Sequence, residues 1–183
     1  MIEIKNEISS ITIAKKLGEL TGTTILPTAE QQAIIESKHW GPAVIIAGAG
    51  SGKTETMSQR VLWLVANGVV APHEILGLTF TRKAAGELSG RIRKRLRQLQ
   101  KVGLMPTNPE TGLPQDIAVE VSTYHSYAGR ALKEYGILLG IDSSVEPIGE
   151  AAAWQIAHNI VTRDGDLEFP LTKTPKSIVE KVM

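Results

Sequence analysis

The chain has 183 residues, of which 42% are hydrophobic and 21% are charged, a composition typical of a globular protein with one sizeable core. It contains no cysteine, which excludes disulfides, thiolate metal sites and cysteine nucleophiles. The formal net charge is only +1, and no apolar run approaches the ~20 residues that a membrane span requires, so we expect no membrane partner.

Residues 1–26 predict a peripheral N-terminal helix that is followed by a Thr/Gly turn. This segment lacks the continuous apolar stretch of a secretory signal, which favours a cytoplasmic location. A second helix is predicted from Pro27 onward, with Thr28 as its N-cap. Gln31 lies three residues after Thr28, which is the spacing of a capping box.

Three apolar runs predict buried strands, and a helical pattern follows each of them. The runs are residues 43–46, 75–80 and 117–123. The helix after the first run is expected to end at Asn67. Its apolar face is predicted to consist of Met57, Val61, Leu64 and Val65. The next helix has the stripe Ala85, Leu88, Ile92, Leu96 and Leu99. This order predicts an α/β fold with a parallel sheet flanked by helices.

The remaining segments predict less regular structure. Residues 102–116 contain three prolines and are expected to form a loop. Residues 124–139 are predicted to be helical. The chain after Ser143 reads as helical material with a proline-containing tail and no strand that would complete the sheet. We therefore expect the chain to stop inside a subdomain.

Positive charge is concentrated in one segment, Arg82–Lys101. It carries a charge of +7, so the rest of the chain carries −6. This asymmetry predicts a contact with a polyanion or with an acidic partner surface. A solvated helix face is the alternative, and charge alone favours it.

The stretch AGAGSGKT provides what a phosphate-binding loop needs. Its glycines allow backbone N–H groups to approach a triphosphate closely. Lys53 supplies a charge for the β- and γ-phosphates, and Thr54 supplies a hydroxyl ligand for Mg²⁺. The pattern G-x-x-x-x-G-K-[ST] has one departure, which is Ala47 in place of the first glycine. The predicted nucleotide-binding residues are Ala47, Gly48, Ala49, Gly50, Ser51, Gly52, Lys53 and Thr54.

Polar and aromatic side chains follow the second and third predicted strands. After the second strand come Thr79, Thr81, Arg82 and Lys83, and after the third come Thr123, Tyr124, His125 and Tyr127. The carboxyl edge of a parallel sheet is where such folds bind ligands, and aromatic rings there suit stacking on an unpaired base. The alternative is that the hydroxyls are helix caps and the aromatic rings belong to the core.

The stretches PTAEQ, AGAGSGKT, LTFTRKAAGEL and STYHSYA together resemble the Q motif and motifs I, Ia and Ic of superfamily I DNA helicases of the UvrD/Rep/PcrA type. The resemblance covers roughly residues 11–162 and looks most like actinobacterial UvrD-like helicases and helicase-nuclease motor subunits. It implies a RecA-like P-loop NTPase domain, with residues 27–142 as motor domain 1A after the peripheral helix of residues 1–26. Residues 143–183 would be the truncated start of helical subdomain 1B.

The same resemblance implies ATP-driven 3′→5′ translocation on single-stranded DNA in repair or recombination, with ATP and Mg²⁺ as cofactors. By this resemblance Gln31 reads adenine, and Lys53 and Thr54 act in catalysis. A second motor or nuclease subunit is a further implied partner. The implied DNA contacts are Thr81, Arg82, Lys83, Thr123, Tyr124 and His125.

The chain departs from the family pattern in three ways. Glu55 stands where many relatives carry Arg, and Tyr124 stands where Phe is common. There is also no Asp-Glu dipeptide, the pair with which family members hold Mg²⁺ and polarise the attacking water. We therefore expect the 183-residue chain alone to be inactive in hydrolysis. The alternative function is a stand-alone nucleotide-dependent DNA- or protein-binding module without hydrolysis, and a small P-loop kinase is disfavoured by TFTRKAA and TYHSYA.

Overall fold

The computed structural model describes residues 7–39, 41–108, 111–113, 115–142, 144–145 and 148–163. Two compact units divide the chain, Met1–Tyr127 and Ala128–Met183. The predictions for the first six residues and for the tail after residue 163 lie outside the described residues. The domain boundaries expected from the sequence stay a prediction.

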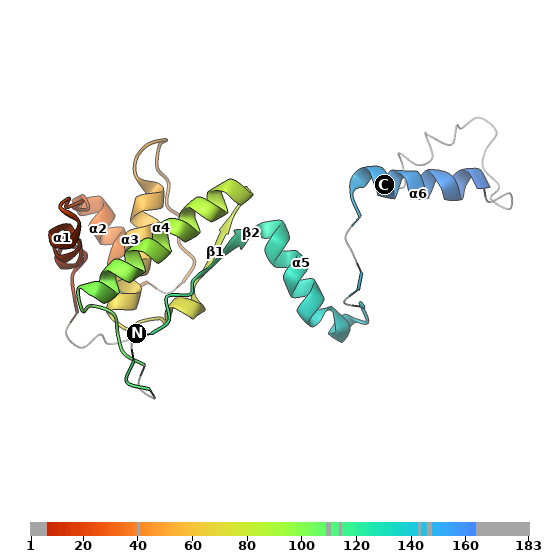
Figure 1. The fold of residues 1–183 in the computed structure, drawn as a ribbon. Helices are drawn as coiled ribbons and strands as arrows, with labels where there is room; N and C mark the ends of the chain where they lie inside the picture. The colour runs from red at the N-terminus through yellow and green to blue at the C-terminus, as the bar shows by residue number, and fades with distance from the viewer. Residues whose placement is uncertain are drawn as a thin grey trace. The chain divides into compact units, whose positions relative to one another are not determined.

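Four helices build most of the first unit, and Figure 1 shows a short sheet on one side of them, next to α4. They are α1 (Ser10–Thr21), α2 (Ala29–Ile35), α3 (Lys53–Ala66) and α4 (Arg82–Lys101). Local signals set their ends. Helix α1 begins after Ser9, whose side chain accepts a hydrogen bond from the Thr12 N–H, and it ends at Gly22 in the left-handed region. The predicted stop of α3 at Asn67 is confirmed.

The hydrophobic core of the first unit lies between α1, α3 and α4. Helix α4 buries the predicted stripe, which confirms that prediction. Helix α1 contributes Ile13 and Leu17 to the same cluster, and α2 contributes Ile35. Trp63 at the centre of α3 is fully buried. Because α1 shares this core, it packs with the other helices of the unit.

The predicted inward face of α3 is only partly right. Val65 is buried and Val61 and Leu64 are half-buried, but Met57 is 50% exposed. The helix instead buries Leu62 and Trp63 most completely. The physical reason is that α3 packs against α1, α2 and α4 at once, so more than one side of the helix is covered. A single-stripe pattern does not describe a helix that is surrounded in this way.

The sheet has two parallel strands among the described residues. Strand β1 (Leu76–Thr79) follows the short 3-10 helix η1 (Pro72–Glu74) and pairs with β2 (Glu120–Thr123), with Thr79 opposite Thr123. Helix α4 connects the strands and packs on both of them. A β-carbon at Gly77 would lie 3.3 Å from Val121 Cγ2, so glycine at this position avoids a tight contact with the neighbouring strand β2. The two strands lie inside the predicted runs.

The strand predicted at residues 43–46 is not formed, which corrects that prediction. Residues 42–48 have no regular structure, and the side chains of Val44 and Ile46 are 87% and 94% exposed. A strand forms only where a neighbouring strand pairs its backbone N–H and C=O groups. Among the described residues no strand pairs with this run. The parallel helix-covered sheet is therefore observed with two strands instead of three.

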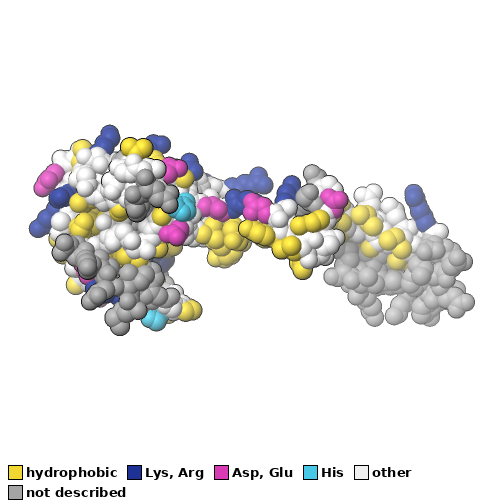
Figure 2. All heavy atoms as spheres, turned by 90° about the horizontal axis from the view of Figure 1, so that it is seen from below, with side chains coloured by type: hydrophobic (Ala, Val, Ile, Leu, Met, Phe, Trp, Pro, Cys, Tyr) yellow, Lys and Arg dark blue, Asp and Glu magenta, His cyan; other side chains and the backbone are white. Residues whose placement is uncertain are grey.

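Helix α5 (Tyr124–Tyr135) begins in the first unit, and the second unit continues with η2 (Gly136–Leu139) and α6 (Glu150–Arg163). Both α-helices were predicted. Neither of them has a buried residue, and Figure 2 shows apolar side chains at their surface. In α6 the rings of Trp154 and His158 stack with their centroids 4.9 Å apart. Within the described ranges, every helix is too short or too polar to span a bilayer.

Candidate functional site

The predicted phosphate loop lies open at the start of α3. Gly52 is the residue before the helix, and Gly50 and Gly52 adopt φ values of 76° and 85°, which favour glycine. Residues 47–51 are exposed, as are Lys53 and Thr54 in the first turn. The first turn of a helix leaves N–H groups without intrahelical partners and carries a partial positive charge. The loop therefore presents backbone donors to solvent at a helix N-terminus.

The side chain of Lys53 folds back over this loop. Its Nζ donates hydrogen bonds to the carbonyl oxygens of Ala47 at 2.7 Å and of Gly48 at 2.6 Å. The Ser51 hydroxyl also donates to the Gly48 carbonyl, at 2.9 Å. An ammonium group and several backbone N–H groups thus converge on one exposed loop, a donor set that fits phosphate oxygens.

Gln31 is joined to both the start of its helix and the phosphate loop. Its Oε1 accepts from the Thr28 N–H at 3.0 Å, and Thr28 Oγ1 accepts from the Gln31 N–H at 3.3 Å, which confirms the capping box. Its Nε2 donates to the Ser51 carbonyl at 3.3 Å. A β-carbon at Gly52 would lie 3.0 Å from this Nε2, so the glycine gives the amide room. The structure therefore brings Gln31 to the loop while it caps α2.

Arg60 fixes α2 against α3. Its Nη1 donates to three carbonyl oxygens at the end of α2, those of Ile34, Ile35 and Ser37, at 2.9 to 3.1 Å. Partial burial lowers the pKa of the Arg60 guanidinium from its usual value. These bonds satisfy carbonyl groups that a helix end leaves without partners. Arg60 thereby helps to hold Gln31 beside the loop.

The two threonines predicted at the strand ends both cap helices. Thr81 Oγ1 accepts from the Ala84 N–H at 3.1 Å at the start of α4. Thr123 Oγ1 accepts from the Ser126 N–H at 3.2 Å and donates to Ser126 Oγ at 2.8 Å. Thr123 is also buried, with 7% of its surface exposed. The capping alternative is therefore correct for both hydroxyls, and DNA contact by them stays a prediction.

The other predicted residues at the strand ends are exposed and lie together. Parallel pairing places the end of β1 next to the end of β2, so the starts of α4 and α5 are neighbours. Arg82, Lys83 and His125 are exposed there. Tyr124 is 48% exposed, and its ring centroid lies 5.3 Å from that of Phe80. The sheet thus brings cations and aromatic rings to one edge.

Sequence reasoning missed Phe80, which is 90% exposed at the end of β1. The sequence pattern predicts it to be the last residue of a buried strand. The available signal was its place between Thr79 and Thr81, where the chain leaves the sheet and turns into a helix. A large ring this exposed beside Tyr124 is well placed to stack on a planar ligand.

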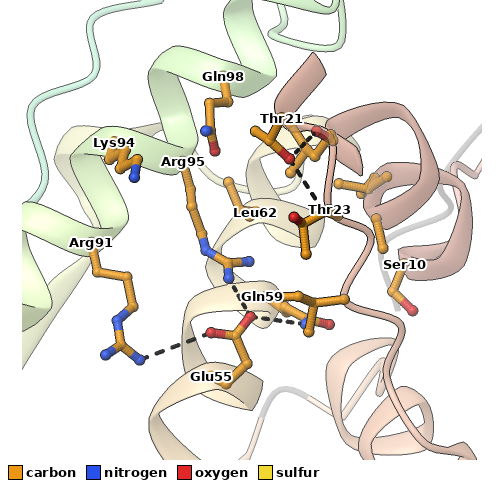
Figure 3. A pocket seen from close by; sticks show the side chains of 14 residues that line it. Ser10, Thr21, Thr23, Glu55, Gln59, Leu62, Arg91, Lys94, Arg95 and Gln98 are labelled. Atoms are coloured by element: carbon orange, nitrogen blue, oxygen red, sulfur yellow. Dashed lines mark hydrogen bonds and ion pairs between the residues drawn. The ribbon is translucent and has the colours of Figure 1, made fainter. Parts of the chain in front are cut away.

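Glu55, one of the departures from the family pattern, binds the basic helix. Its Oε1 lies 2.5 Å from Arg95 Nη2 and its Oε2 lies 3.9 Å from Arg91 Nη1. Gln59 Nε2 donates to the same carboxylate at 3.0 Å. Figure 3 shows these three side chains converging on Glu55 from α3 and α4. Part of the basic segment is therefore used inside the fold, while Arg93 and Arg97 remain exposed.

The described residues contain no cluster of three or more His, Asp or Glu side chains that would hold a metal ion by itself. The exposed Thr54 hydroxyl as one ligand of a magnesium ion that also binds a triphosphate stays a prediction. This matches the way in which Mg²⁺ usually binds, through one or two protein ligands together with substrate phosphates.

Comparison with known proteins gives one family. Residues 27–182 match the sequence profile of the UvrD/REP helicase N-terminal domain. The ATP-dependent DNA helicase UvrD2 of Mycobacterium bovis is 37% identical over 110 residues, which are 60% of this chain and 14% of that protein. DNA helicase IV of Escherichia coli is 45% identical over 71 residues, or 39% of this chain and 10% of that protein.

A longer match is found in DNA helicase II of Rickettsia typhi. It is 30% identical over 142 residues, which are 75% of this chain and 18% of that protein. The chain thus spans less than a fifth of the length of these curated relatives. The profile match includes Gln31, the phosphate loop and both strand ends.

Proposed function

This chain belongs to the UvrD/REP helicase N-terminal domain family, and from that membership we propose that it is the ATP-binding part of an ATP-dependent DNA helicase. The helicase would move 3′→5′ on single-stranded DNA in repair or recombination. The observation that carries this proposal is the exposed loop before α3, where Lys53 Nζ lies over the carbonyl oxygens of Ala47 and Gly48. The proposal includes a RecA-like fold for residues 27–142 and a helical subdomain from residue 143.

The phosphate loop has a specific task in this proposal. Lys53 exchanges its two carbonyl contacts for oxygens of the β- and γ-phosphates, and the N–H groups of Gly50 to Thr54 surround them. Magnesium would neutralise charge on the phosphates, with Thr54 as its protein ligand. Gln31 would turn its amide from the Thr28 N–H and the Ser51 carbonyl toward adenine, since an amide offers both a donor and an acceptor.

The edge formed by the two strand ends is proposed to hold single-stranded DNA. Phe80 and Tyr124 offer exposed rings on which bases stack, and the exposed Arg82, Lys83 and His125 follow the same two strand ends. Base stacking of this kind is tolerant of sequence because every base has a planar face. A translocating motor needs such tolerance. A second motor or nuclease subunit stays a prediction from the resemblance.

The alternative is a stand-alone nucleotide-dependent DNA- or protein-binding module without hydrolysis. It would use the same exposed phosphate loop and the same strand-end residues. The chain alone is expected to be inactive under both functions, so phosphate release with and without single-stranded DNA is measured on the chain and on the uninterrupted gene product. DNA-stimulated turnover by the latter supports the helicase. Turnover that DNA stimulates and that Lys53→Ala abolishes would exclude the binding module.

Gln31→Ala is expected to narrow the preference of the chain for ATP over GTP. The lost pair of hydrogen bonds to adenine is worth about 1–3 kcal/mol of discrimination, by analogy with base readout. Competition of ATP and GTP against a fluorescent nucleotide measures the change. Thr28→Ala is the matched control, because it removes the Oγ1 cap of α2 and keeps the amide of Gln31. An unmutated chain that binds ATP and GTP equally would leave Gln31 with its capping role alone.

Lys83→Ala is expected to weaken binding of single-stranded DNA. The slope of log K against log salt concentration should become shallower by ~0.7, which is the contribution of about one phosphate contact. Lys83 is exposed in the first turn of α4, three residues after the exposed Phe80. Arg93→Ala removes an equal charge further along the same helix and is expected to have a smaller effect. Fluorescence anisotropy with labelled oligo(dT) at several salt concentrations gives both quantities. If Arg93→Ala weakens DNA binding more than Lys83→Ala does, the DNA lies along α4 and the proposed binding edge is wrong.

A further inference from the structure

A pocket of about 420 Å³ opens between α1, α3 and α4 (Figure 3). Its α3 side is formed by Glu55, Gln59 and Leu62, which share one face of the helix. The residues that line it include neither the phosphate loop nor the strand-end residues. Its size lies within the ~300–1,000 Å³ that is usual for small-molecule sites.

The walls of this pocket differ in chemistry. Ile13 and Leu17 of α1, together with Leu62, provide an apolar floor. The opposite wall carries three cations of α4, Arg91, Lys94 and Arg95. Glu55 is the one carboxylate in the lining, so the lining carries a net positive charge even after the Glu55–Arg95 pair has formed. An apolar floor beside surplus positive charge suits an anion with an apolar body.

Gln59 adds a second, independent feature. Its side chain is 8% exposed, and its Nε2 donates to Glu55 Oε1 at 3.0 Å. Its own Oε1 is buried and has no hydrogen-bond partner. A buried acceptor without a partner is unfavourable and uncommon in folded proteins. Since Gln59 lines the pocket, a ligand with an N–H or O–H group would supply the missing donor.

We propose that this pocket binds a small organic anion with an apolar or aromatic body and an N–H or O–H donor. The body packs on Ile13, Leu17 and Leu62, and the donor binds Gln59 Oε1. The anionic group binds Lys94, which is exposed at the rim, and Arg91, which lies 3.9 Å from Glu55 and keeps donors for a ligand. None of the residues that line this pocket is among those proposed for ATP and DNA.

Indole-3-acetate is a suitable probe because it combines a carboxylate, a ring N–H and an apolar bicycle. We expect it to bind the chain with a dissociation constant of ~1 mM, as its size predicts. In an NMR titration the shifts should centre on the side-chain amide of Gln59 and on the methyl groups of Leu62 and Ile13. Shifts centred on Gly48–Thr54 would place the probe at the phosphate loop and overturn the proposal, as would no binding at 10 times that concentration.

Two analogues test the two polar contacts. 1-Methylindole-3-acetate lacks the donor and indole-3-acetamide lacks the charge, and each is expected to bind at least about fivefold more weakly. Lys94→Gln should weaken the binding of indole-3-acetate and leave the binding of indole-3-acetamide unchanged. Gln59→Met should remove the difference between the parent compound and its N-methyl analogue.

Arg93→Gln is the matched control for charge, because Arg93 is on the same helix but does not line the pocket. Lys94 is exposed, so its variant tests the charge contact even where Gln59→Met fails to fold. Equal binding of the three indoles, or an effect of Arg93→Gln as large as that of Lys94→Gln, would show only unspecific attraction and would overturn the proposed site.

Discussion

Lys53→Ala is expected to lower the affinity of the chain for Mg-ATP by about 100-fold or more. The Lys53 ammonium lies 2.6 and 2.7 Å from two loop carbonyls and is exposed, so it is placed to bind phosphate and does not support the core. Each hydrogen bond from a charged group contributes about 1.5–3 kcal/mol, and Lys53 is expected to make two with the triphosphate. Equilibrium binding of a fluorescent ATP analogue measures the loss.

Lys16→Ala is the matched control for Lys53→Ala. Lys16 is an exposed lysine on α1, so its loss changes the net charge equally without touching the loop. Circular dichroism should show the same helix content in both variants and in the unmutated chain. Equal ATP affinity in Lys53→Ala and Lys16→Ala would contradict the prediction that this loop binds phosphate.

Trp63→Ala is expected to lower the free energy of unfolding by about 3–5 kcal/mol. Trp63 is fully buried in the core shared by α1, α3 and α4, and its removal would leave a large cavity. Its Nε1 is buried without a hydrogen-bond partner. Trp63→Phe keeps most of the ring and removes that unpaired N–H, so it should cost less. Urea denaturation followed by circular dichroism gives both values.

Comparing the free energies of unfolding of Trp63→Ala and Trp63→Phe separates the contribution of ring packing from that of the polar N–H group. If Trp63→Phe destabilises as much as Trp63→Ala, the indole N–H has a role in the core that the structure does not show. A cost below about 1 kcal/mol for Trp63→Ala would contradict its position at the centre of the core.

The features predicted correctly from the sequence are those that depend on neighbours along the chain. The α4 stripe follows from residues three and four apart on one helix, and all of its members are buried. The Thr28–Gln31 capping box depends on residues three apart, and both of its bonds are present. The stop of α3 at Asn67 is equally local.

The features predicted wrongly depend on partners distant in the sequence. Residues 43–46 have the composition of a strand, but a strand requires a partner backbone, and none is placed beside them in the described part of the chain. The buried face of α3 is set by three other helices. The ion pair between Glu55 and Arg95 joins residues 40 positions apart, and no local pattern indicates it.

The candidate site divides in the same way. The phosphate loop was predicted from its glycine, lysine and threonine pattern alone, and its role in nucleotide binding stays a prediction. The pairing of Phe80 with Tyr124 needed the register of β1 and β2. The contact of Gln31 with Ser51 needed the packing of α2 against α3, which Arg60 supports.

The most direct test of the account is an NMR titration of the chain with Mg-ATP. The account predicts saturable shifts of the backbone amides of Gly50, Gly52, Lys53 and Thr54 and of the side-chain amide of Gln31, with no such shifts in Lys53→Ala. Shifts spread over the exposed arginines of α4, with the loop amides unchanged, would show that ATP binds only as an anion to the basic helix and would contradict the account.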